Sequence, residues 1–535
     1  MISKRRENEV ENNKTIIIYD STLRDGAQAG GISYTLEDKL KIVERLDKFG
    51  VKFIEAGNPG SNIKDQEFFA RVKKMRLKNA KLIAFGSTRR VGINVKDDPN
   101  IQSLIAADTE AVAIFGKSWD FHVKEVLKTT EDENLQMIYD TIKYLKSLGK
   151  YVVFDAEHFF DGYKNNKKYA LETLKVAKEA GADSLDLCDT NGGTFPMDVY
   201  NITKEVVEMF PGTMIGIHCH NDTGMAVANS VMAVLAGARQ VQGTINGYGE
   251  RCGNADLITL IPNLQLKLGF KCVPDENIKH LTSLSRYVAE IANMIPNERA
   301  PYVGAYAFTH KAGMHIDAVK KNPASFEHIN PEIVGNTRRI VLSEVAGRAT
   351  ILDKIREIDP TVTKDSPVTK EIIDELKRLE NEGYQFESAE ASFEMLIRKK
   401  LGLYQPFFTL KEFKVLINEP AVEYSSSAIV KIAVDGVTAI TAAEGDGPVH
   451  ALDSALRKAL EKFYPELKEV HLVDYKVRVL NAETATAAKV RVLIESTDGK
   501  DTWTTVGVST DIVNASWIAL VDSLEYKLCK EKVGK

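Results

Sequence analysis

Two histidines, His218 and His220, lie at the end of a short apolar run that begins at Met214. Residues two apart in an extended strand point to the same face, so both imidazoles face one side and Cys219 faces the other. A pair of imidazoles at the end of a strand is a suitable pair of ligands for a divalent metal ion. The motif is short, however, and two unrelated polar residues at a strand end explain it equally well by itself.

The elements that position these histidines alternate regularly over residues 15–270. Short β-rich runs are separated by longer segments with helical periodicity, including Leu36–Phe49, Glu133–Leu148, Leu171–Ala180 and Ala226–Ala236. Eight such pairs in about 250 residues predict an α/β fold, a (β/α)8 TIM barrel. An open doubly wound sheet is the alternative, but the glycine fingerprint usual after its first strand is absent. The expected strands are Thr15–Tyr19, Val51–Glu55, Lys81–Phe85, Ala111–Phe115, Tyr151–Asp155, Ser184–Cys188, Met214–His218 and Gln242–Asn246.

Polar residues follow every predicted strand, and in a barrel this is where catalytic residues gather. Asp25 follows the first strand, His218 and His220 end the seventh, and Asn254 lies in the segment after the eighth. One carboxylate, two imidazoles and an amide oxygen favour a catalytic site for Mn²⁺, Mg²⁺ or Zn²⁺ with open coordination positions. Such a metal ion can chelate a 2-oxo acid and polarise its carbonyl group.

Three further residues at strand ends suit substrate binding. Arg24 is adjacent to Asp25 and can donate hydrogen bonds to an oxyanion, with a structural ion pair across the barrel as the alternative. Thr190, after the sixth strand, can bind a carboxylate or serve only as a loop hydroxyl. Glu157, after the fifth strand, can orient the substrate or relay protons, or be a solvated or ion-paired glutamate.

The overall composition is that of a soluble globular protein with two to four domains. The chain has 535 residues, of which 44% are hydrophobic and 27% charged. Its net charge of -5 argues against nucleic-acid binding. The five cysteines form no C-x-x-C pair and favour a reduced, cytoplasmic setting. No apolar run approaches the roughly 20 residues of a membrane span, and the highly charged residues 1–14 predict a disordered tail rather than a secretory signal.

The chain beyond the barrel divides into two further parts. Residues 271–402 predict a mostly helical connector that contains the polar segment His310–Asp317 and the loop Asp359–Pro367. Its expected helices are Leu281–Met294, Lys370–Glu382 and Ala389–Leu401.

Residues 403–535 predict a separate α+β domain with an internal repeat. Val449–Leu456 and Val513–Leu520 share apolar positions at an offset of 64 residues, and each follows three strand-like runs. The pattern predicts a duplicated βββα unit. The N-terminal ends of the two helices can hold a carboxylate or be capped in the ordinary way. The expected strands are Phe413–Ile417, Ser427–Val434, Val437–Glu444, Val473–Val479, Ala487–Ile494 and Trp503–Ser509.

Three motifs resemble the signatures of the 2-isopropylmalate synthase/homocitrate synthase family. They are Asp20–Gln28 (DSTLRDGAQ), His218–Gly224 (HCHNDTG) and Gly243–Leu257 (GTINGYGERCGNADL). Members of this family perform a Claisen-type condensation of acetyl-CoA with a 2-oxo acid. The resemblance extends from Thr15 through the connector to a C-terminal part similar to the family's LeuA-type dimerisation and allosteric domain.

Three other segments are most similar to the long-type citramalate synthases of this family, which use pyruvate. They are Phe53–Asn62, Ala84–Arg90 and Ile114–Val123. The resemblance implies an acyltransferase that converts acetyl-CoA and pyruvate to (R)-citramalate and CoA in isoleucine biosynthesis. It also implies a homodimer, in which the connector of one chain caps the partner's barrel, and inhibition by isoleucine bound to the C-terminal domain.

The resemblance also implies roles for individual residues. The divalent metal ion is bound by Asp25, His218, His220 and Asn254. The oxo acid is bound or faced by Arg24, Thr190 and Glu157.

Two connector residues, His315 and Asp317, match positions that help to deprotonate the acetyl methyl group. Phe326 is a departure from the family, whose members often have a tyrosine there with an assigned role in proton relay or thioester contact. Candidates to replace that phenol are Tyr302, Tyr306 and His310.

Three alternatives remain open. A 2-isopropylmalate synthase would use a larger oxo acid and leucine as its regulator. A lyase or carboxyltransferase of the same barrel superfamily is suggested by Cys252, but the C-terminal repeat argues against it. A non-catalytic amino-acid sensor is the alternative of another class, and the intact set of Asp25, His218 and His220 argues against it.

Overall fold

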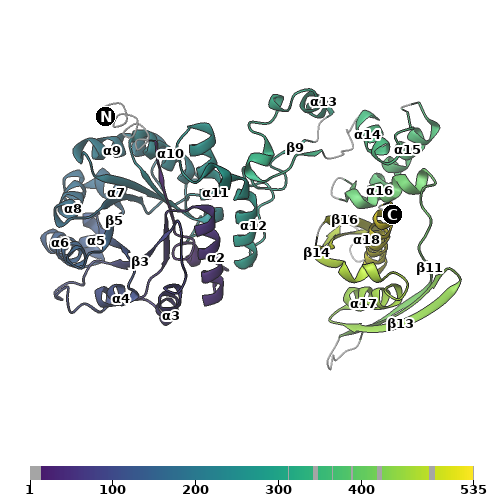
Figure 1. The fold of residues 1–535 in the computed structure, drawn as a ribbon, viewed down its shortest axis with the longest axis horizontal. Helices are drawn as coiled ribbons and strands as arrows, with labels where there is room; N and C mark the ends of the chain where they lie inside the picture. Colours follow the sequence, from purple (N-terminus) through teal and green to yellow (C-terminus); the bar gives the residue numbers. More distant parts are fainter. Residues whose placement is uncertain are drawn as a thin grey trace. The chain divides into compact units, whose positions relative to one another are not determined.

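The computed structural model describes residues 14–310, 313–340, 348–363, 365–386, 389–417, 425–480, 488–499 and 501–533. The chain forms two compact units (Figure 1). The first comprises Met1–Phe308 with Ile329–Arg338, and the second comprises Thr309–His328 with Arg339–Lys535. Among the described residues, no helix has the length and apolar character needed to cross a bilayer.

The first unit is built on a closed barrel of eight parallel strands in chain order, which confirms the predicted fold. Closure is made by β1 and β8, whose ladder pairs Tyr19 with Gln242 and Asp20 with Gly243. The strands are β1 (Ile17–Asp20), β2 (Phe53–Gly57), β3 (Lys81–Ser87), β4 (Ala111–Lys117), β5 (Tyr151–Glu157), β6 (Ser184–Asp189), β7 (Met214–Cys219) and β8 (Gln240–Gly243).

Helices surround the barrel, and local capping fixes where they begin (Figure 1). Leu36–Phe49 and Ala226–Ala236 are helical over the predicted residues. The predicted helix Leu171–Ala180 begins four residues earlier, because Asn166 accepts a hydrogen bond from the backbone N–H of Tyr169 and caps the helix there. The helices are α2 (Leu36–Phe49), α3 (Ile63–Val72), α4 (Pro99–Ala107), α5 (Asp120–Glu125), α6 (Glu131–Ser147), α7 (Phe159–Asn165), α8 (Lys167–Ala180), α9 (Pro196–Met209), α10 (Ala226–Ala236), α11 (Leu257–Pro262) and α12 (Leu281–Ile291).

The strands differ from the predicted ones mainly at the end where polar residues gather. β4 and β5 each run two residues further, so that Lys117 pairs with Glu157 in the ladder. The predicted strand Gln242–Asn246 is wrong by two to three residues, because β8 ends at Gly243 and Asn246 has a left-handed backbone (φ 62°). Asn246 therefore turns the chain away from the barrel wall.

The barrel interior has an apolar part and a polar part. The apolar part is a small cluster of Tyr19, Phe53, Ile83, Ala111, Ala113 and Val153. The polar part comprises Asp155, Asp186, Gln240 and Gln242, all buried. Gly216 on β7 leaves room for this part, since a Cβ atom there would lie 2.2 Å from Oδ2 of Asp186.

The predicted connector contributes to both units. α12 belongs to the first unit, and the second contains α13 (Gly313–Lys321), α14 (Arg348–Ile358), α15 (Pro367–Glu382) and α16 (Glu390–Lys400). The segment predicted as polar also forms a short strand, β9 (Thr309–His310), which pairs in parallel with β10 (Arg339–Ile340). Residues 311–312 of that segment lie outside the described residues.

The C-terminal part contains two βββα units, which confirms the predicted repeat. Each unit is a three-stranded antiparallel sheet followed by a helix. The first consists of β11 (Thr409–Ile417), β12 (Ser426–Val434), β13 (Val437–Gly445) and α17 (Pro448–Leu460). The second consists of β14 (His471–Val479), β15 (Val490–Thr497), β16 (Thr502–Ser509) and α18 (Ile512–Val533). The predicted strand Ala487–Ile494 is shifted, and its first residue lies outside the described residues.

The two repeats differ at their helix N-termini and in what covers their sheets. Asp511 caps the second helix by accepting a hydrogen bond from the backbone N–H of Val513 at 2.8 Å, whereas Gly447 brings no side-chain cap to the first. Leu493, Val506 and Val508 of the second sheet pack in one apolar cluster with α14, α15 and α16.

We expect Gly162→Ala to destabilise the barrel by about 1–3 kcal/mol, because overpacking forces the backbone to shift. A Cβ atom at Gly162, on α7, would lie 2.1 Å from the backbone oxygen of Ser118. Thermal unfolding measures the effect, with Gly193→Ala as the control because a Cβ atom there has no neighbour within 4 Å. Equal melting temperatures for the two variants would contradict the close packing of Gly162 against Ser118.

Candidate metal centre at the carboxyl ends of the strands

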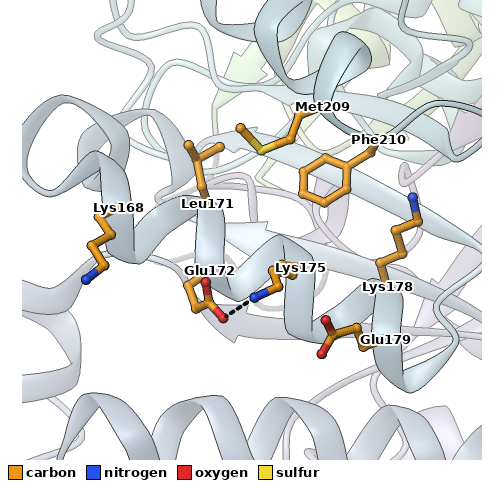
Figure 2. A pocket seen from close by; sticks show the side chains of 8 residues that line it. All are labelled: Lys168, Leu171, Glu172, Lys175, Lys178, Glu179, Met209 and Phe210. Atoms are coloured by element: carbon orange, nitrogen blue, oxygen red, sulfur yellow. Dashed lines mark hydrogen bonds and ion pairs between the residues drawn. The ribbon is translucent and has the colours of Figure 1, made fainter.

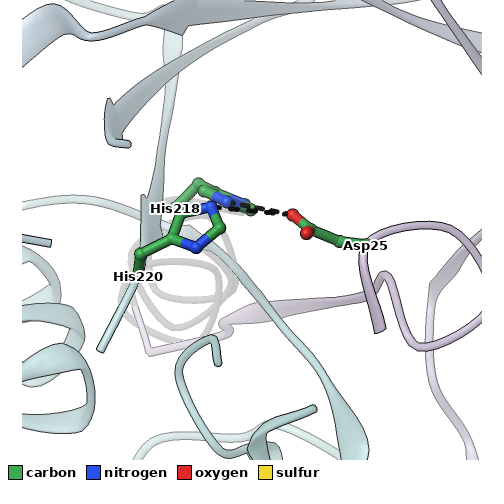
Figure 3. Close-up of side chains that lie close together, drawn as sticks. All are labelled: Asp25, His218 and His220. Carbon is green, nitrogen blue, oxygen red and sulfur yellow. Dashed lines mark ion pairs between the residues drawn. The ribbon is translucent and has the colours of Figure 1, made fainter. Parts of the chain in front are cut away.

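Asp25, His218 and His220 converge at the end of the barrel where the strands terminate (Figure 3). One ligand atom from each lies within 4.8 Å of the others, and all three residues are buried. Oδ2 of Asp25 is 3.4 Å from Nε2 of His218 and 3.9 Å from Nε2 of His220. The ladders of β8 with β1 and with β7 bring together these residues, which are distant in the sequence.

Asn254 joins this cluster through its backbone. Asn254 forms an isolated antiparallel bridge with His220, and its Nδ2 donates to the carbonyl oxygen of Tyr248 at 3.2 Å. Gly249 permits this approach, since a Cβ atom there would lie 2.1 Å from Nδ2 of Asn254. A side-chain hydrogen bond between Asn254 and Asp25 places the amide of Asn254 at the cluster.

The electrostatics keep this cluster in the protonation state that metal ligands need. Burial raises the pKa of the Asp25 carboxyl. The electrostatic effects of Arg24, His218 and His220 lower that pKa by more than burial raises it, to about 2. Burial and the neighbouring His218 lower the pKa of His220 to about 3. Burial also lowers the pKa of His218. At neutral pH the cluster therefore offers one carboxylate and two neutral imidazoles.

These residues fit a divalent metal ion. Oδ1 of Asn254 and Nδ1 of His220 are buried and have no hydrogen-bond partner among the described residues. Buried polar atoms are rarely left in this state, and a bound ion is one explanation. The donor set of carboxylate, imidazole and amide oxygen, without thiolate, suits Mn²⁺, Mg²⁺ or Zn²⁺.

Arg24 lies next to the cluster and is held from three sides. Its Nε forms a close ion pair with Glu55, its Nη1 is 3.2 Å from Oδ2 of Asp25, and its guanidinium lies 3.8 Å from the centre of the Phe85 ring. The structural ion pair left open as an alternative is thus present. The ion pairs with Glu55 and Asp25 use two of the three guanidinium nitrogens. The third nitrogen, Nη2, keeps its hydrogens for an anionic substrate.

Glu55 is a residue of this site that the sequence did not single out. Its fully buried carboxylate accepts hydrogen bonds from the hydroxyl groups of Tyr19 and Ser21 in addition to Arg24. A buried charge is stable only when it is paired and hydrogen-bonded, and Glu55 meets both conditions. Sequence position gave one signal, since Glu55 ends the predicted strand Val51–Glu55, and the structure pairs that strand, β2, with β1.

Thr190 and Glu157 lie at neighbouring strand ends. Oγ1 of Thr190 accepts a hydrogen bond from the backbone N–H of His158 at 2.9 Å. Glu157 is partly exposed and forms a close ion pair with Lys117 of the adjacent strand. Both residues are thus at the end of the barrel that carries the metal-ligand cluster.

His315 and Asp317 belong to α13 of the second unit. Both are exposed, and Asp317 pairs with Lys321 at 2.7 Å. The His315 ring stacks on Phe326, with ring centres 4.1 Å apart. Of the residues considered as substitutes for the missing phenol, Tyr302 donates its hydroxyl to Asn263 at 2.7 Å and His310 lies 3.0 Å from Glu327.

A hollow on the outer surface lies elsewhere, between α8 and the end of α9 (Figure 2). It has a volume of about 660 Å³. Its floor contains Leu171, Met209 and Phe210, and its charged residues pair locally, as Lys175 does with Glu172 at 3.2 Å. It holds no cluster of catalytic groups.

The fold and the site together define a catalytic barrel of the HMGL-like class. A family model described as HMGL-like matches residues 15–288. A second, described as homocitrate synthase post-HMGL domain-like, matches residues 302–384, and a third, described as the LeuA allosteric (dimerisation) domain, matches residues 387–528. The chain belongs to the (R)-citramalate synthase family within this class.

Full-length relatives support this assignment. The chain is 56% identical to the (R)-citramalate synthase of Aquifex aeolicus, over 97% of this chain and 98% of the relative. It is 51% identical to the (R)-citramalate synthase of Geobacter sulfurreducens, over 96% of this chain and 98% of the relative. A probable 2-isopropylmalate synthase of Methanopyrus kandleri is 36% identical to this chain, over 94% of this chain and 96% of the relative. It is thus a more distant relative than the two citramalate synthases.

We expect Mn²⁺ to raise the melting temperature of chelator-treated protein, because a ligand that binds only the folded state stabilises it. At a concentration 100 times the dissociation constant, the gain is about 2.7 kcal/mol. His220→Ala should abolish most of this gain, whereas His280→Ala, an exposed histidine elsewhere, should leave it unchanged. A Mn²⁺-dependent shift that His220→Ala leaves intact would place the metal ion at another site.

Proposed function

We propose that this chain condenses acetyl-CoA with pyruvate and releases (R)-citramalate and CoA. The observation that carries the proposal is the buried cluster of Asp25, His218 and His220 beside Arg24. The names of full-length relatives 44–56% identical to the chain supply the substrate assignment.

The metal-ligand cluster positions the oxo acid. Asp25, His218, His220 and Asn254 would hold a divalent metal ion, which acts as a Lewis acid on the carbonyl group of the oxo acid when bound. Arg24 donates hydrogen bonds to the oxygen of that carbonyl as negative charge develops on it. Thr190 binds the carboxylate, and Glu157 faces the substrate.

The bond-forming step needs a base for acetyl-CoA. In our proposal His315, assisted by Asp317, removes a proton from the acetyl methyl group. The resulting carbanion attacks C2 of pyruvate, a carbon–carbon bond forms, and the C2 oxygen takes up a proton. Water then cleaves the thioester, which releases CoA and draws the reaction forward.

We further propose a homodimer regulated through its C-terminal part. The match of residues 387–528 to a LeuA allosteric (dimerisation) domain supports both features. Isoleucine, the amino acid downstream of citramalate, is our candidate effector. Its carboxylate would suit the first helix of the repeat, where Gly447 brings no side-chain cap, better than the second, where Asp511 occupies the position.

The decisive experiment measures CoA release by thiol titration from acetyl-CoA with Mn²⁺ or Mg²⁺. We expect a clear preference for pyruvate over 2-oxoisovalerate and 2-oxoglutarate. Preference for 2-oxoisovalerate would reassign the chain to 2-isopropylmalate synthesis but retain the mechanism. Absence of release with all three acids would contradict the condensing activity.

We expect Arg24→Lys to lower kcat/KM by about 10²–10³-fold, the usual cost of losing an oxyanion donor. A lysine lacks the planar fork that reaches Glu55, Asp25 and the substrate together. Steady-state kinetics with pyruvate measure the change. Arg45→Lys is the matched control, because the guanidinium of Arg45 lies over Tyr287 in a different part of the barrel. Similar losses in both variants would assign the effect to stability.

A further inference from the structure

Two glutamines on β8, Gln240 and Gln242, point into the barrel and are fully buried. They are two residues apart, so both side chains lie on the same face of the strand. Both donate from Nε2 to Oδ2 of Asp186, at 2.6 Å and 2.8 Å. Only Gln242 also contacts a residue of the metal-ligand cluster, His218.

The surroundings of Gln242 decide which way its amide faces. Asp186 accepts hydrogen bonds from Ser184, Gln240 and Gln242, so its carboxyl group acts as an acceptor. Nε2 of Gln242 donates a second hydrogen bond to Oδ1 of Asp155 at 2.8 Å. Both hydrogens of the amide are thereby used, and its oxygen must point to the opposite side.

That oxygen fixes the tautomer of His218. Oε1 of Gln242 lies 2.8 Å from Nδ1 of His218, and a carbonyl oxygen can only accept. Nδ1 therefore carries the hydrogen of the neutral ring, and Nε2 is left with its lone pair. Nε2 is the atom that faces Asp25, 3.4 Å from its Oδ2.

We propose that Gln242 is a positioning residue that holds His218 in the one tautomer and orientation able to bind the metal ion. The proposal rests on the metal centre of the proposed function. Asp155 and Asp186 orient the amide of Gln242, and this amide in turn orients the imidazole of His218. Hydrogen-bond partners of this kind commonly change metal affinity by about 10–100-fold.

A purely structural role is the competing explanation, because Gln242 also fills the barrel interior. Gln240 provides a control that distinguishes the positioning role from the structural one. It is equally buried and shares Asp186 with Gln242, but among the described residues its side chain donates hydrogen bonds only to Asp186 and Ser184. Loss of packing and of the hydrogen bond to Asp186 should thus be similar in Gln240→Met and Gln242→Met.

The test measures Mn²⁺ binding to the full-length, chelator-treated chain by titration calorimetry, without substrate. We expect Gln242→Met to bind Mn²⁺ about 10–100-fold more weakly than the parent. Gln240→Met should stay within about twofold, because it leaves the hydrogen bond to His218 in place. Equal weakening in both variants, or parent affinity in Gln242→Met, would overturn the proposal.

Gln242→Glu provides a second and opposite test. A glutamate keeps an oxygen to accept from Nδ1 of His218 but places its other oxygen against Asp155 and Asp186. We expect lower thermal stability than the parent together with parent-like Mn²⁺ affinity. The contrast with the weaker binding of Gln242→Met then assigns the affinity to the accepting oxygen, because a general loss of stability would weaken binding in both Gln242 variants. Affinity as low as that of Gln242→Met would refute the proposal.

This result is separable from the proposed function. The absence of CoA release by the parent chain with pyruvate would refute the condensing activity, while the Mn²⁺ comparison would still decide the role of Gln242. The absence of Mn²⁺ binding by the parent chain would remove the metal centre and, with it, this inference.

Discussion

The ladder between β1 and β8 is the contact on which the site depends. It closes the sheet and so carries the end of the first strand to the seventh and eighth. Asp25 and the two histidines belong to opposite ends of the barrel sequence and can share a cation only because the sheet is closed. An open sheet made of the same strands would leave the carboxylate and the imidazoles at different edges.

Burial makes this arrangement electrostatically demanding. Several kcal/mol are lost for each ion taken out of water unless its charge is paired and its hydrogen-bonding groups are satisfied. Arg24 lies between Glu55 and Asp25 and balances one of their two charges. One negative charge remains beside two neutral imidazoles, and such a cluster suits a divalent cation.

The sequence predicted that Asp25, His218 and His220 lie together, as they do, because a barrel places the residues after each strand at one end. It placed Glu55 at the end of the predicted strand Val51–Glu55 but gave it no role, and it did not identify Gln242. Both lie within strands, where a polar residue gives no sign of its partner until the barrel register is known. It also missed β9 and β10, since two residues are too few for an alternating pattern to be recognised. His315 and Asp317 came from family resemblance alone, and their roles stay predictions.

Gly216 has a consequence for how this barrel can evolve. The Asp186 carboxylate occupies the space that any side chain at position 216 would need. An alanine there would displace an acceptor shared by both glutamines of β8. The effect of a side chain at position 216 is therefore expected to depend on the residues at positions 186, 240 and 242, which share that carboxylate. Lineages that retain the polar interior are expected to inherit glycine, aspartate and the glutamines as one unit, while the residues around the mouth diverge independently.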